Sequence, residues 1–326
     1  MVICVTRKVR ALLRDHQYGV LKGGYKIAQH TMRRARRQDL GLRELILLLD
    51  FANAFNEADR ALMLKLVSVN LTELAKLAEW LYAKESGLVT EDGRQLTSST
   101  GVQGCGLANI LFGLLIFFID GRLDPQGNLR LKKFYWDDGK LVGTPEAVSE
   151  VKLKKCHAHC GTPELAEELQ VRNLVDESGF VDDMKLSLID SNVHIHPDLN
   201  LDYLQVPHGD DDFVEEQLDQ KLTALEESLS LVSRMPAKHG AFILLQKCAS
   251  VCKVNHLMRT IPPQQISKFI QKFDFLVKET FERILGLYEP LTDYQWAVAR
   301  LPLKYSGMLL RTGLSTRGAH YFNSFL

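Results

Sequence analysis

Long hydrophobic runs are missing from this chain of 326 residues. The longest, Leu107 to Ile119, is too short to span a bilayer and is typical of a buried helix. The opening "MVICVTRKVR" places its basic residues after the apolar ones, which is the wrong order for a secretory signal. We therefore expect an intracellular protein with no membrane partner, in which the six cysteines are reduced thiols.

The chain also lacks a net charge, because 40 lysine and arginine residues balance 40 aspartate and glutamate residues. The distribution is uneven, since Arg7 to Arg43 is basic and Asp182 to Glu227 is acidic. A basic stretch is compatible with a polyanionic partner, although a charge run is more often a solvated face. With 46% hydrophobic residues and no internal repeat, the composition is that of a folded protein of two or three lobes.

The usual arrangement of ligand pairs in a zinc finger is likewise absent. Two groups mix cysteine with histidine: "CHAHC" (Cys156, His157, His159, Cys160) and "CASVCKVNH" (Cys248, Cys252, His256). Neither has the usual arrangement of ligand pairs, and a free cysteine is commonly a small core residue. Core packing is therefore the preferred interpretation, and zinc is the alternative.

The order of the expected elements indicates an α+β fold. An apolar strand from Leu45 ends at Asp50 and precedes two helices, the first of which Asn56 can cap. A hairpin turning at Asp92-Gly93, the buried helix and a second hairpin, Phe134 to Val142, come next. This order is compatible with a split βαβ sheet backed by helices. The C-terminal third reads as helices, with a break at Pro262-Pro263.

Three carboxylates stand at the ends of these apolar elements. Asp50 closes the first strand, and Asp137 and Asp138 lie side by side at the tip of the second hairpin, where Asp138-Gly139 is a turn signal. The ordinary interpretation of such a pair is two turn acids in water. If strand and hairpin are neighbours in one sheet, however, the three carboxylates converge and suit a hard cation such as Mg²⁺. Two such ions about 4 Å apart can activate a 3′-hydroxyl and stabilise a leaving pyrophosphate.

Four segments, in sequence order, resemble the palm motifs of reverse transcriptases, and most closely those of LINE-type (non-LTR) retrotransposons. They are "LLLDFANAFN", "GVQGCGLANILF", "FYWDDGKLV" and "LDYLQVPHG". The similarity extends from "QYGVLKGGYKIAQHTMRR" near the start to "RLPLKYSGMLLRTG" near the end. The aromatic-x-Asp-Asp motif alone is weak, whereas its combination with D-x-x-x-A-F at Asp50 to Phe55 and with Gln103-Gly104 is specific.

The resemblance implies a polymerase right-hand architecture, with a palm of split βαβ antiparallel sheet backed by helices, partial fingers and a helical thumb-like lobe. Residues 1–44 would form the partial fingers, 45–210 the palm with fingers-derived helices at 57–100, and 211–326 the helical thumb and C-terminal region. The implied function is that of an RNA-directed DNA polymerase that adds nucleotides to a primer 3′-hydroxyl. Its partners would be an RNA template, a DNA primer and deoxynucleoside triphosphates, and its place in the cell the nucleus.

The resemblance also assigns roles to single residues. Asp50, Asp137 and Asp138 would be catalytic and would hold two Mg²⁺ ions, or Mn²⁺ in their place, assisted by the Phe51 carbonyl. The substrate-binding residues would be Phe55 under the nucleotide sugar, Gln103 and Gly104 at the template–nucleotide pair, and Lys185 near the triphosphate. Core packing is the alternative for Phe55, and a surface position is the alternative for Lys185.

Two further segments correspond to parts of the family's nucleic-acid site. Leu204 to Gly209 would be the primer-grip turn. In the basic N-terminal stretch a cation would meet triphosphate or template phosphates. The sequence does not choose among Arg7, Lys8, Arg10 and Arg14.

The second motif departs from the family pattern, which reads Gly-Val-x-Gln-Gly-Asp/Cys-Pro-Leu-Gly/Ser-Pro. Here it is one residue shorter before the glycine and has Gly106 and Asn109 in place of the two prolines. Loss of proline at a helix start is expected to loosen the loop, and the fingers segment looks truncated. The sequence therefore leaves activity undecided, and an inactive fragment is one reading. The alternatives are a non-catalytic retroelement relic that keeps the palm fold and nucleic-acid binding, and another palm-type enzyme such as a nucleotide cyclase.

Overall fold

The computed structural model describes residues 2–37, 43–51, 54–56, 58–89, 92–98, 100, 105–123, 127–148, 156–167, 193–313 and 317–324. These residues form an α+β protein that is mostly helical and contains a five-strand mixed sheet and two-strand hairpins. The chain divides into two compact units, Met1–Leu199 and Asn200–Leu326. The expected α+β class is therefore confirmed.

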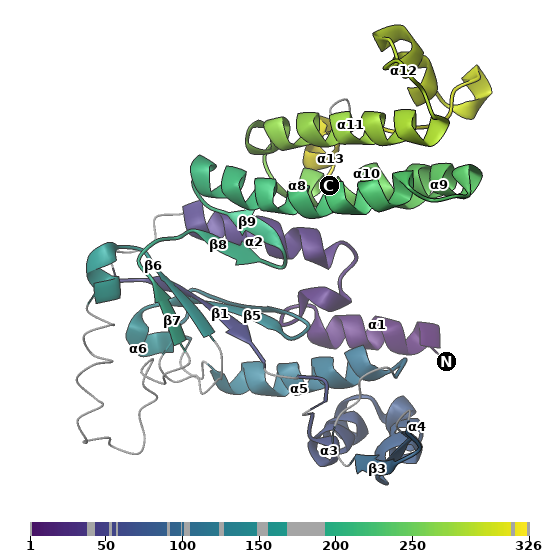
Figure 1. Cartoon of the computed structure of the whole chain (residues 1–326). Coiled ribbons are helices and arrows are strands. Elements are labelled where there is room, and N and C mark those ends of the chain that lie inside the picture. Colours follow the sequence, from purple (N-terminus) through teal and green to yellow (C-terminus); the bar gives the residue numbers. More distant parts are fainter. Residues whose placement is uncertain are drawn as a thin grey trace. The chain divides into compact units, whose positions relative to one another are not determined.

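The first unit contains a five-strand sheet with the order β4-β5-β1-β6-β7 (Figure 1). Its strands are β1 (Leu45–Asp50), β4 (Leu131–Tyr135), β5 (Asp138–Gly143), β6 (Cys156–Cys160) and β7 (Val193–His196). The central strand β1 is antiparallel to both of its neighbours, β5 and β6. A strand with a neighbour on each side and helices close by is buried along its length, which explains why β1 is a nearly continuous run of leucine and isoleucine.

The expectation of an antiparallel sheet was wrong at one edge. Strand β7 pairs with β6 in parallel, so the sheet is mixed. A parallel pair needs a long connection between its strands, and residues 161–192 supply one. The pairs β4–β5, β5–β1 and β1–β6 are antiparallel, as expected.

One helix of the first unit, α5, is strongly apolar and is contacted by α1 and α3. The remaining elements of this unit are α1 (Val2–Leu13), the 3₁₀ turn η1 (Tyr18–Val20), α2 (Gly24–Arg37), α3 (Arg60–Asn70), α4 (Thr72–Tyr82), the hairpin β2 (Ser86–Val89) and β3 (Gln95–Ser98), α5 (Ala108–Leu123) and α6 (Pro145–Val148). Helices α1 and α5 lie side by side, and α3 lies next to α5 (Figure 1). The expected hairpin near Asp92-Gly93 and the expected buried helix are both confirmed.

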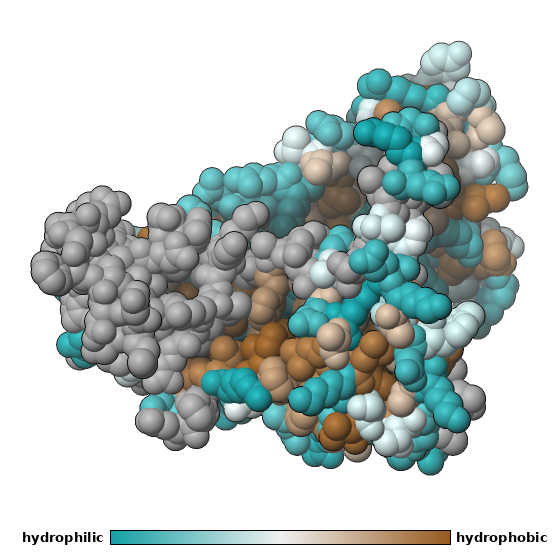
Figure 2. Space-filling view, turned by 90° about the horizontal axis from the view of Figure 1, so that it is seen from below, coloured by the Kyte–Doolittle hydropathy of each residue, from teal (hydrophilic) through white to brown (hydrophobic). Residues whose placement is uncertain are grey.

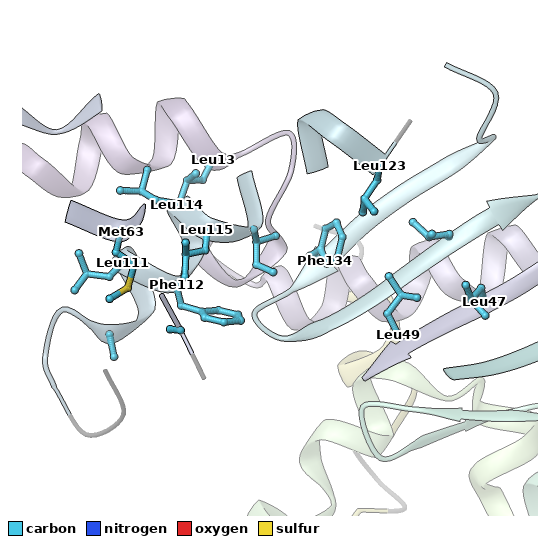
Figure 3. Close-up of a cluster of buried hydrophobic side chains, with 14 of the residues drawn as sticks. Leu13, Leu47, Leu49, Met63, Leu111, Phe112, Leu114, Leu115, Leu123 and Phe134 are labelled. Atoms are coloured by element: carbon cyan, nitrogen blue, oxygen red, sulfur yellow. The ribbon is translucent and has the colours of Figure 1, made fainter. Parts of the chain in front are cut away.

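The hydrophobic core of this unit runs from α5 to the sheet (Figure 3). Leu111 and Leu114 of α5 are fully buried, close to Leu13 of α1 and Met63 of α3. Phe134 of β4 is also fully buried and belongs to the same cluster. Because α5 is apolar on all sides, it can contact several elements at once, which a one-faced amphipathic helix cannot do.

The N-terminus of α3 differs from the expectation. Asp59 caps this helix, since its carboxylate accepts a hydrogen bond of 3.0 Å from the Leu62 amide. Asn56 does not cap it, because the helix begins only at Arg60 and a cap must stand next to the first helical residue. The interpretation of Asn56 as the cap was therefore wrong.

Helices dominate the second unit. Its elements are the hairpin β8 (Leu201–Tyr203) and β9 (Val206–His208), then α8 (Asp211–Ser233), α9 (Lys238–Leu244), the π-helical segment η2 (Leu245–Ala249), α10 (Val251–Thr260), α11 (Pro263–Leu285), α12 (Asp293–Arg300), the 3₁₀ turn η3 (Leu303–Tyr305) and α13 (Arg317–Phe322). The two long helices α8 and α11 contact each other, and two ion pairs connect them: Lys268–Glu215 at 2.8 Å and Lys272–Asp219 at 2.7 Å. The break expected at Pro262-Pro263 is the start of α11.

The surface of the first unit keeps some large apolar side chains. Val69 of α3 and Trp80 of α4 are 72% and 80% exposed. Figure 2 shows hydrophobic residues gathered among hydrophilic ones on the face that is seen from below.

None of the helices within the described ranges combines the length and the apolar character that a membrane crossing would require.

Candidate active site at the β4–β5 hairpin

The register of β1 and β5 brings the end of the first strand to the tip of the hairpin. Asp50, the last residue of β1, is the pairing partner of Asp138, the first residue of β5. Residues directly opposite each other in an antiparallel pair share one face of the sheet and have Cβ atoms about 4.5–5.5 Å apart. Two positions that lie 88 residues apart along the chain are therefore neighbours across two strands.

Asp137 occupies the turn between β4 and β5. Tyr135 and Asp138 are the last pair of the ladder, so that Trp136 and Asp137 form a two-residue turn. Trp136 has a φ of 55°, whereas Asp137 is not among the residues with positive φ. Positive φ at the first turn residue alone is the pattern of a type II′ turn, whose twist matches that of the flanking strands.

The sequence suggested that Asp138-Gly139 makes the turn, but the structure places the turn before these residues. Both residues belong to β5, and Gly139 has no positive φ. Glycine is needed there for a different reason, because a Cβ on Gly139 would lie 2.7 Å from Phe134 Cε1 and 2.9 Å from Leu49 Cδ1. Close packing between neighbouring strands, rather than turn geometry, therefore explains the glycine after the acidic pair.

A buried glutamine holds this turn from outside the sheet. The amide of Gln17, which is fully buried, forms two hydrogen bonds with the peptide groups of Trp136. Its Nε2 donates to the Trp136 carbonyl at 3.1 Å, and its Oε1 accepts from the Trp136 N–H at 2.6 Å. The same Oε1 accepts from the Gly19 N–H at 3.1 Å. One side chain thus satisfies both backbone groups of a turn residue and caps η1.

The backbone around Gln17 is itself fixed against β4 and α5. The Phe134 N–H donates to the His16 carbonyl at 3.3 Å, and the Lys133 ammonium donates to the Asp15 carbonyl. The His16 imidazole forms a hydrogen bond with the buried carboxylate of Asp120 in α5. The segment before η1 is therefore tied to the strand and to the core helix at the same time.

A lysine two residues after the acidic pair is fully buried. Lys140 Nζ donates to the Ala28 carbonyl at 2.7 Å and lies 5.4 Å from the centre of the Tyr18 ring. Burial, and to a smaller extent the charge of Lys133, lowers the pKa of Lys140 from 10.5 to about 7. Burial also raises the pKa of Tyr18, and the hydrogen bond between the Tyr18 and Thr31 hydroxyl groups acts in the opposite direction.

The charge of one member of the acidic pair acts on Tyr135, which precedes the turn. Its pKa is raised, first by burial and second by the negative charge of Asp138. Asp137 and Asp138 are both half-buried. Among the described side chains, no three histidine, cysteine, aspartate or glutamate groups are gathered as ligands of one metal ion; the side chain of Asp50 lies outside this description.

The two phenylalanines of the first motif pack against the core. The Phe51 ring lies 6.4 Å from the ring of Phe134, measured between centroids. The Phe55 ring lies 4.4 Å from the ring of Phe112 in α5, at an angle of 30°. Both side chains are half-buried. Packing thus accounts for one side of the Phe55 ring, and its role beneath a nucleotide sugar stays a prediction.

The N-terminal cations differ in their surroundings. The Lys8 ammonium pairs with the carboxylate of Glu73. Arg10 and Arg14 line a cavity of about 470 Å³ together with Asp15 and Leu21, and Arg14 Nε lies 3.4 Å from the Asp15 carboxylate. Arg10 Nε donates to the Val20 carbonyl at 3.2 Å, which places this cavity beside η1 and hence beside the segment that holds the turn.

Three predicted substrate-binding residues, Gln103, Gly104 and Lys185, lie outside the described residues. The expected primer-grip segment, Leu204 to Gly209, contains a turn: Leu204 and Gln205 have φ of 53° and 62° between β8 and β9. Positive φ at both central residues is the pattern of a type I′ turn. Its role at a primer stays a prediction.

The two histidines of "CHAHC" lie next to His194 and His196, which the sequence did not connect with them. His157 and His159 of β6 are in register with His194 and His196 of β7, and His157 Nδ1 lies 3.2 Å from His196 Nε2. Cys160 is buried, and burial raises the pKa of its thiol to about 11, which disfavours the thiolate that zinc requires. Core packing holds for Cys160. In the second group, however, Cys248 and Cys252 are exposed, so core packing was the wrong interpretation for those two.

Sequence reasoning missed Gln17 and Lys140 as parts of this site. The only local signal near Gln17 was Gly19, because glycine permits another group to approach the backbone closely. The group that does so is a side chain, since a Cβ on Gly19 would overlap the indole ring of Trp136. Nothing local marked Lys140, which is buried within β5, between β1 and β4, and contacts α2 and η1.

The comparisons with known proteins do not identify a family. No family model matches the chain, and no curated protein matches it.

Proposed function

We propose that this chain is the core of an RNA-directed DNA polymerase of the LINE-type retroelement class, which transfers nucleotides to a primer 3′-hydroxyl. The observation that supports the proposal is the register in which Asp50 pairs with Asp138, next to Asp137 in the turn. The sequence motifs suggested that these three positions converge, and an antiparallel pairing of β1 with β5 is what such convergence requires. The polymerase assignment itself rests on the resemblance of the motifs.

The donor set fits a hard divalent cation. Asp50, Asp137 and Asp138 offer only carboxylate oxygens, which Mg²⁺ and Mn²⁺ prefer, and the Phe51 carbonyl is a further oxygen close to Asp50 in the chain. These residues would hold two ions. When bound, such ions supply activation of the attacking hydroxyl and neutralisation of the charge on the leaving pyrophosphate.

The chain's own residues would bind and orient the substrates. Asp137 and Asp138 are both half-buried, which leaves part of each side chain open to solvent and to a phosphate-bearing substrate. Arg10 is the cation best placed to bind phosphate, because it lines a cavity, whereas Lys8 pairs with Glu73 and Arg14 pairs with Asp15 at 3.4 Å. Phe55, held from one side by Phe112, would exclude a 2′-hydroxyl by its bulk. An RNA template and a DNA primer would be bound chiefly through their phosphates.

Primer extension tests the proposal. The purified chain, with an RNA template, an annealed DNA primer, deoxynucleotides and Mg²⁺, is expected to extend the primer, and Asp137→Asn to abolish extension by removing a charged ligand. Asp92→Asn is the matched control, because it changes an exposed turn carboxylate of the β2–β3 hairpin, away from the β4–β5 turn. Primer binding without extension in the unaltered chain, under Mg²⁺ and under Mn²⁺, would exclude polymerase activity.

One sequence observation favours a second candidate, a non-catalytic relic that binds nucleic acid. The second motif, "GVQGCGLAN", is one residue shorter than the family pattern and lacks both prolines. If this shortening is what disables the chain, inserting the absent residue and introducing proline at Gly106 and Asn109 should restore extension. A restored variant that still fails to extend a primer would point to damage elsewhere.

A further inference from the structure

The conformation of Trp136 is unusual for its residue type. With φ at 55° it lies in the left-handed region, which bulky side chains enter rarely and which favours glycine or asparagine. Backbone strain of this kind persists only where the surrounding structure holds it, and it gathers at functional sites. The next residues in the chain are Asp137 and Asp138.

The surroundings that hold Trp136 come from one short segment. Gln17 accepts from the Trp136 N–H at 2.6 Å and donates to the Trp136 carbonyl at 3.1 Å. Gly19, two residues further on, leaves the space in which the indole ring lies, because any Cβ there would overlap it. Both peptide groups and the side chain of Trp136 are thus fixed by residues more than 100 positions away.

A relaxed turn would misplace the acidic pair. Two-residue turns with negative φ at both positions twist in the wrong sense and splay the strands they connect. If Trp136 relaxed to negative φ, the ladder between Tyr135 and Asp138 would open, and Asp138 would move relative to its partner Asp50. The distance between carboxylates of a shared metal site tolerates little displacement.

We infer that Gln17 is a positioning residue: it locks the strained β4–β5 turn so that Asp137 and Asp138 stand in register with Asp50 and can share divalent cations. The inference rests on the proposed function, because it assigns the turn to a metal site. Gln17 touches no reacting atom in this scheme and acts only through the backbone of Trp136. A residue that orients ligands from outside the ligand set typically changes metal affinity by about 10- to 100-fold when it is removed.

The test uses Mn²⁺ alone as the probe, in the whole chain, with binding measured by electron paramagnetic resonance. Gln17→Met keeps the length and bulk of the side chain but removes the hydrogen bonds that the Gln17 amide makes with Trp136 and Gly19. Gln29→Met is the matched control, because Gln29 is also a fully buried glutamine, on α2. Amide hydrogen exchange of Trp136 and Gly19, followed by NMR, reports the turn independently of any metal, since both N–H groups donate to Gln17.

We expect Gln17→Met to lose exchange protection at both amides and to raise the Mn²⁺ dissociation constant at least tenfold, while Gln29→Met changes neither. In a Trp136→Gly background the added effect of Gln17→Met should be smaller, because glycine adopts positive φ without strain. If Gln17→Met does not fold, Gly19→Ala, which displaces the indole ring, is measured with the same two readouts.

Lost protection together with Mn²⁺ affinity within twofold of the Gln29→Met control would overturn the inference, because the hydrogen bonds would then be purely structural. Failure of the proposed function looks different. In that case the unaltered chain and Asp137→Asn bind Mn²⁺ equally, so there is no metal site at the turn. The inference is then rejected before any Gln17 variant is compared.

Discussion

Because Lys140 is buried, the free energy of unfolding of the first unit should depend on pH above neutrality, and the structure gives the direction of the change. The unfolded chain holds the lysine proton up to a pH near 10.5, whereas burial lowers the pKa to about 7 in the folded protein. Between these values the unfolded state binds more protons, so that the free energy of unfolding rises with pH. Below pH 7 both states are protonated, and the unfavourable effect of the buried charge is fully present.

The magnitude follows from the two pKa values. The interval between about 7 and 10.5 corresponds to roughly 5 kcal/mol at about 1.4 kcal/mol per pH unit. Limiting the experiment to pH 7–9.5 keeps it below the usual pKa of tyrosine, because Tyr18 and Tyr135 have raised pKa values and act in the opposite sense at higher pH. Over this range we expect a rise of about 3 kcal/mol from Lys140.

The assay compares urea unfolding of the unaltered chain with that of Lys140→Met, which keeps the aliphatic bulk and removes the amine. With Trp80 and Trp296 replaced by phenylalanine, Trp136 fluorescence reports the first unit alone. Subtracting the two pH curves removes the contributions of the other titrating groups. The variant also leaves the Ala28 carbonyl without its 2.7 Å bond, a constant loss of about 1 kcal/mol that does not change with pH.

Two results would refute this reasoning. The first is a difference between the two proteins that stays flat from pH 7 to 9.5. The second is a direct titration, by NMR of ¹³C-labelled lysine, in which the signal that Lys140→Met removes titrates near 10.5. The exposed residue Lys76 of α4 provides the control, because Lys76→Met should leave the slope unchanged.

Two further predictions concern histidine and glycine. Burial, and then the charges of His196 and His157, lowers the pKa of His159 to about 3. As pH falls below 6.5, the unfolded state therefore takes up the proton before the folded state does. The free energy of unfolding should then decline by up to about 1.4 kcal/mol per pH unit toward pH 4. Urea unfolding of His159→Leu should show a flatter slope there, and equal slopes would contradict the assignment. Gly139→Ala should destabilise the first unit by about 1–3 kcal/mol, because its Cβ would press on Phe134 and Leu49. Gly87→Ala, where nothing lies within 4 Å of the added Cβ, is the control, and an equal loss in both variants would reject the packing explanation.

Several elements could be predicted from local pattern because the physical cause is itself local. The run from Leu107 is apolar on every side, and a helix of that composition must be buried, as α5 is. Asp92-Gly93 carries a turn signal in its own two residues, and Gly93 has φ of 82°. The helical region expected over residues 211–326 begins with α8 (Asp211–Ser233).

Prediction from local sequence was wrong where two different physical causes select the same residues. Asp138-Gly139 has the composition of a turn, yet the glycine is required by the Phe134 ring, and the turn lies at Trp136-Asp137. No propensity favours tryptophan with positive φ. The hydrogen bonds from Gln17 and the space left by Gly19 hold that conformation, and both come from a segment that sequence spacing does not connect with the hairpin.

The sequence by itself determined that an apolar strand ends in Asp50, that a hairpin carries Asp137 and Asp138, and that helices fill the C-terminal part, because strand, hairpin and helix each arise from neighbouring residues. The tertiary structure decided that Asp50 pairs with Asp138, that β7 joins β6 in parallel, and that Lys140 is buried against Ala28. Those outcomes depend on which surfaces pack together over long separations. Many pairings satisfy the same alternation of apolar and polar residues, and the fold selects one of them.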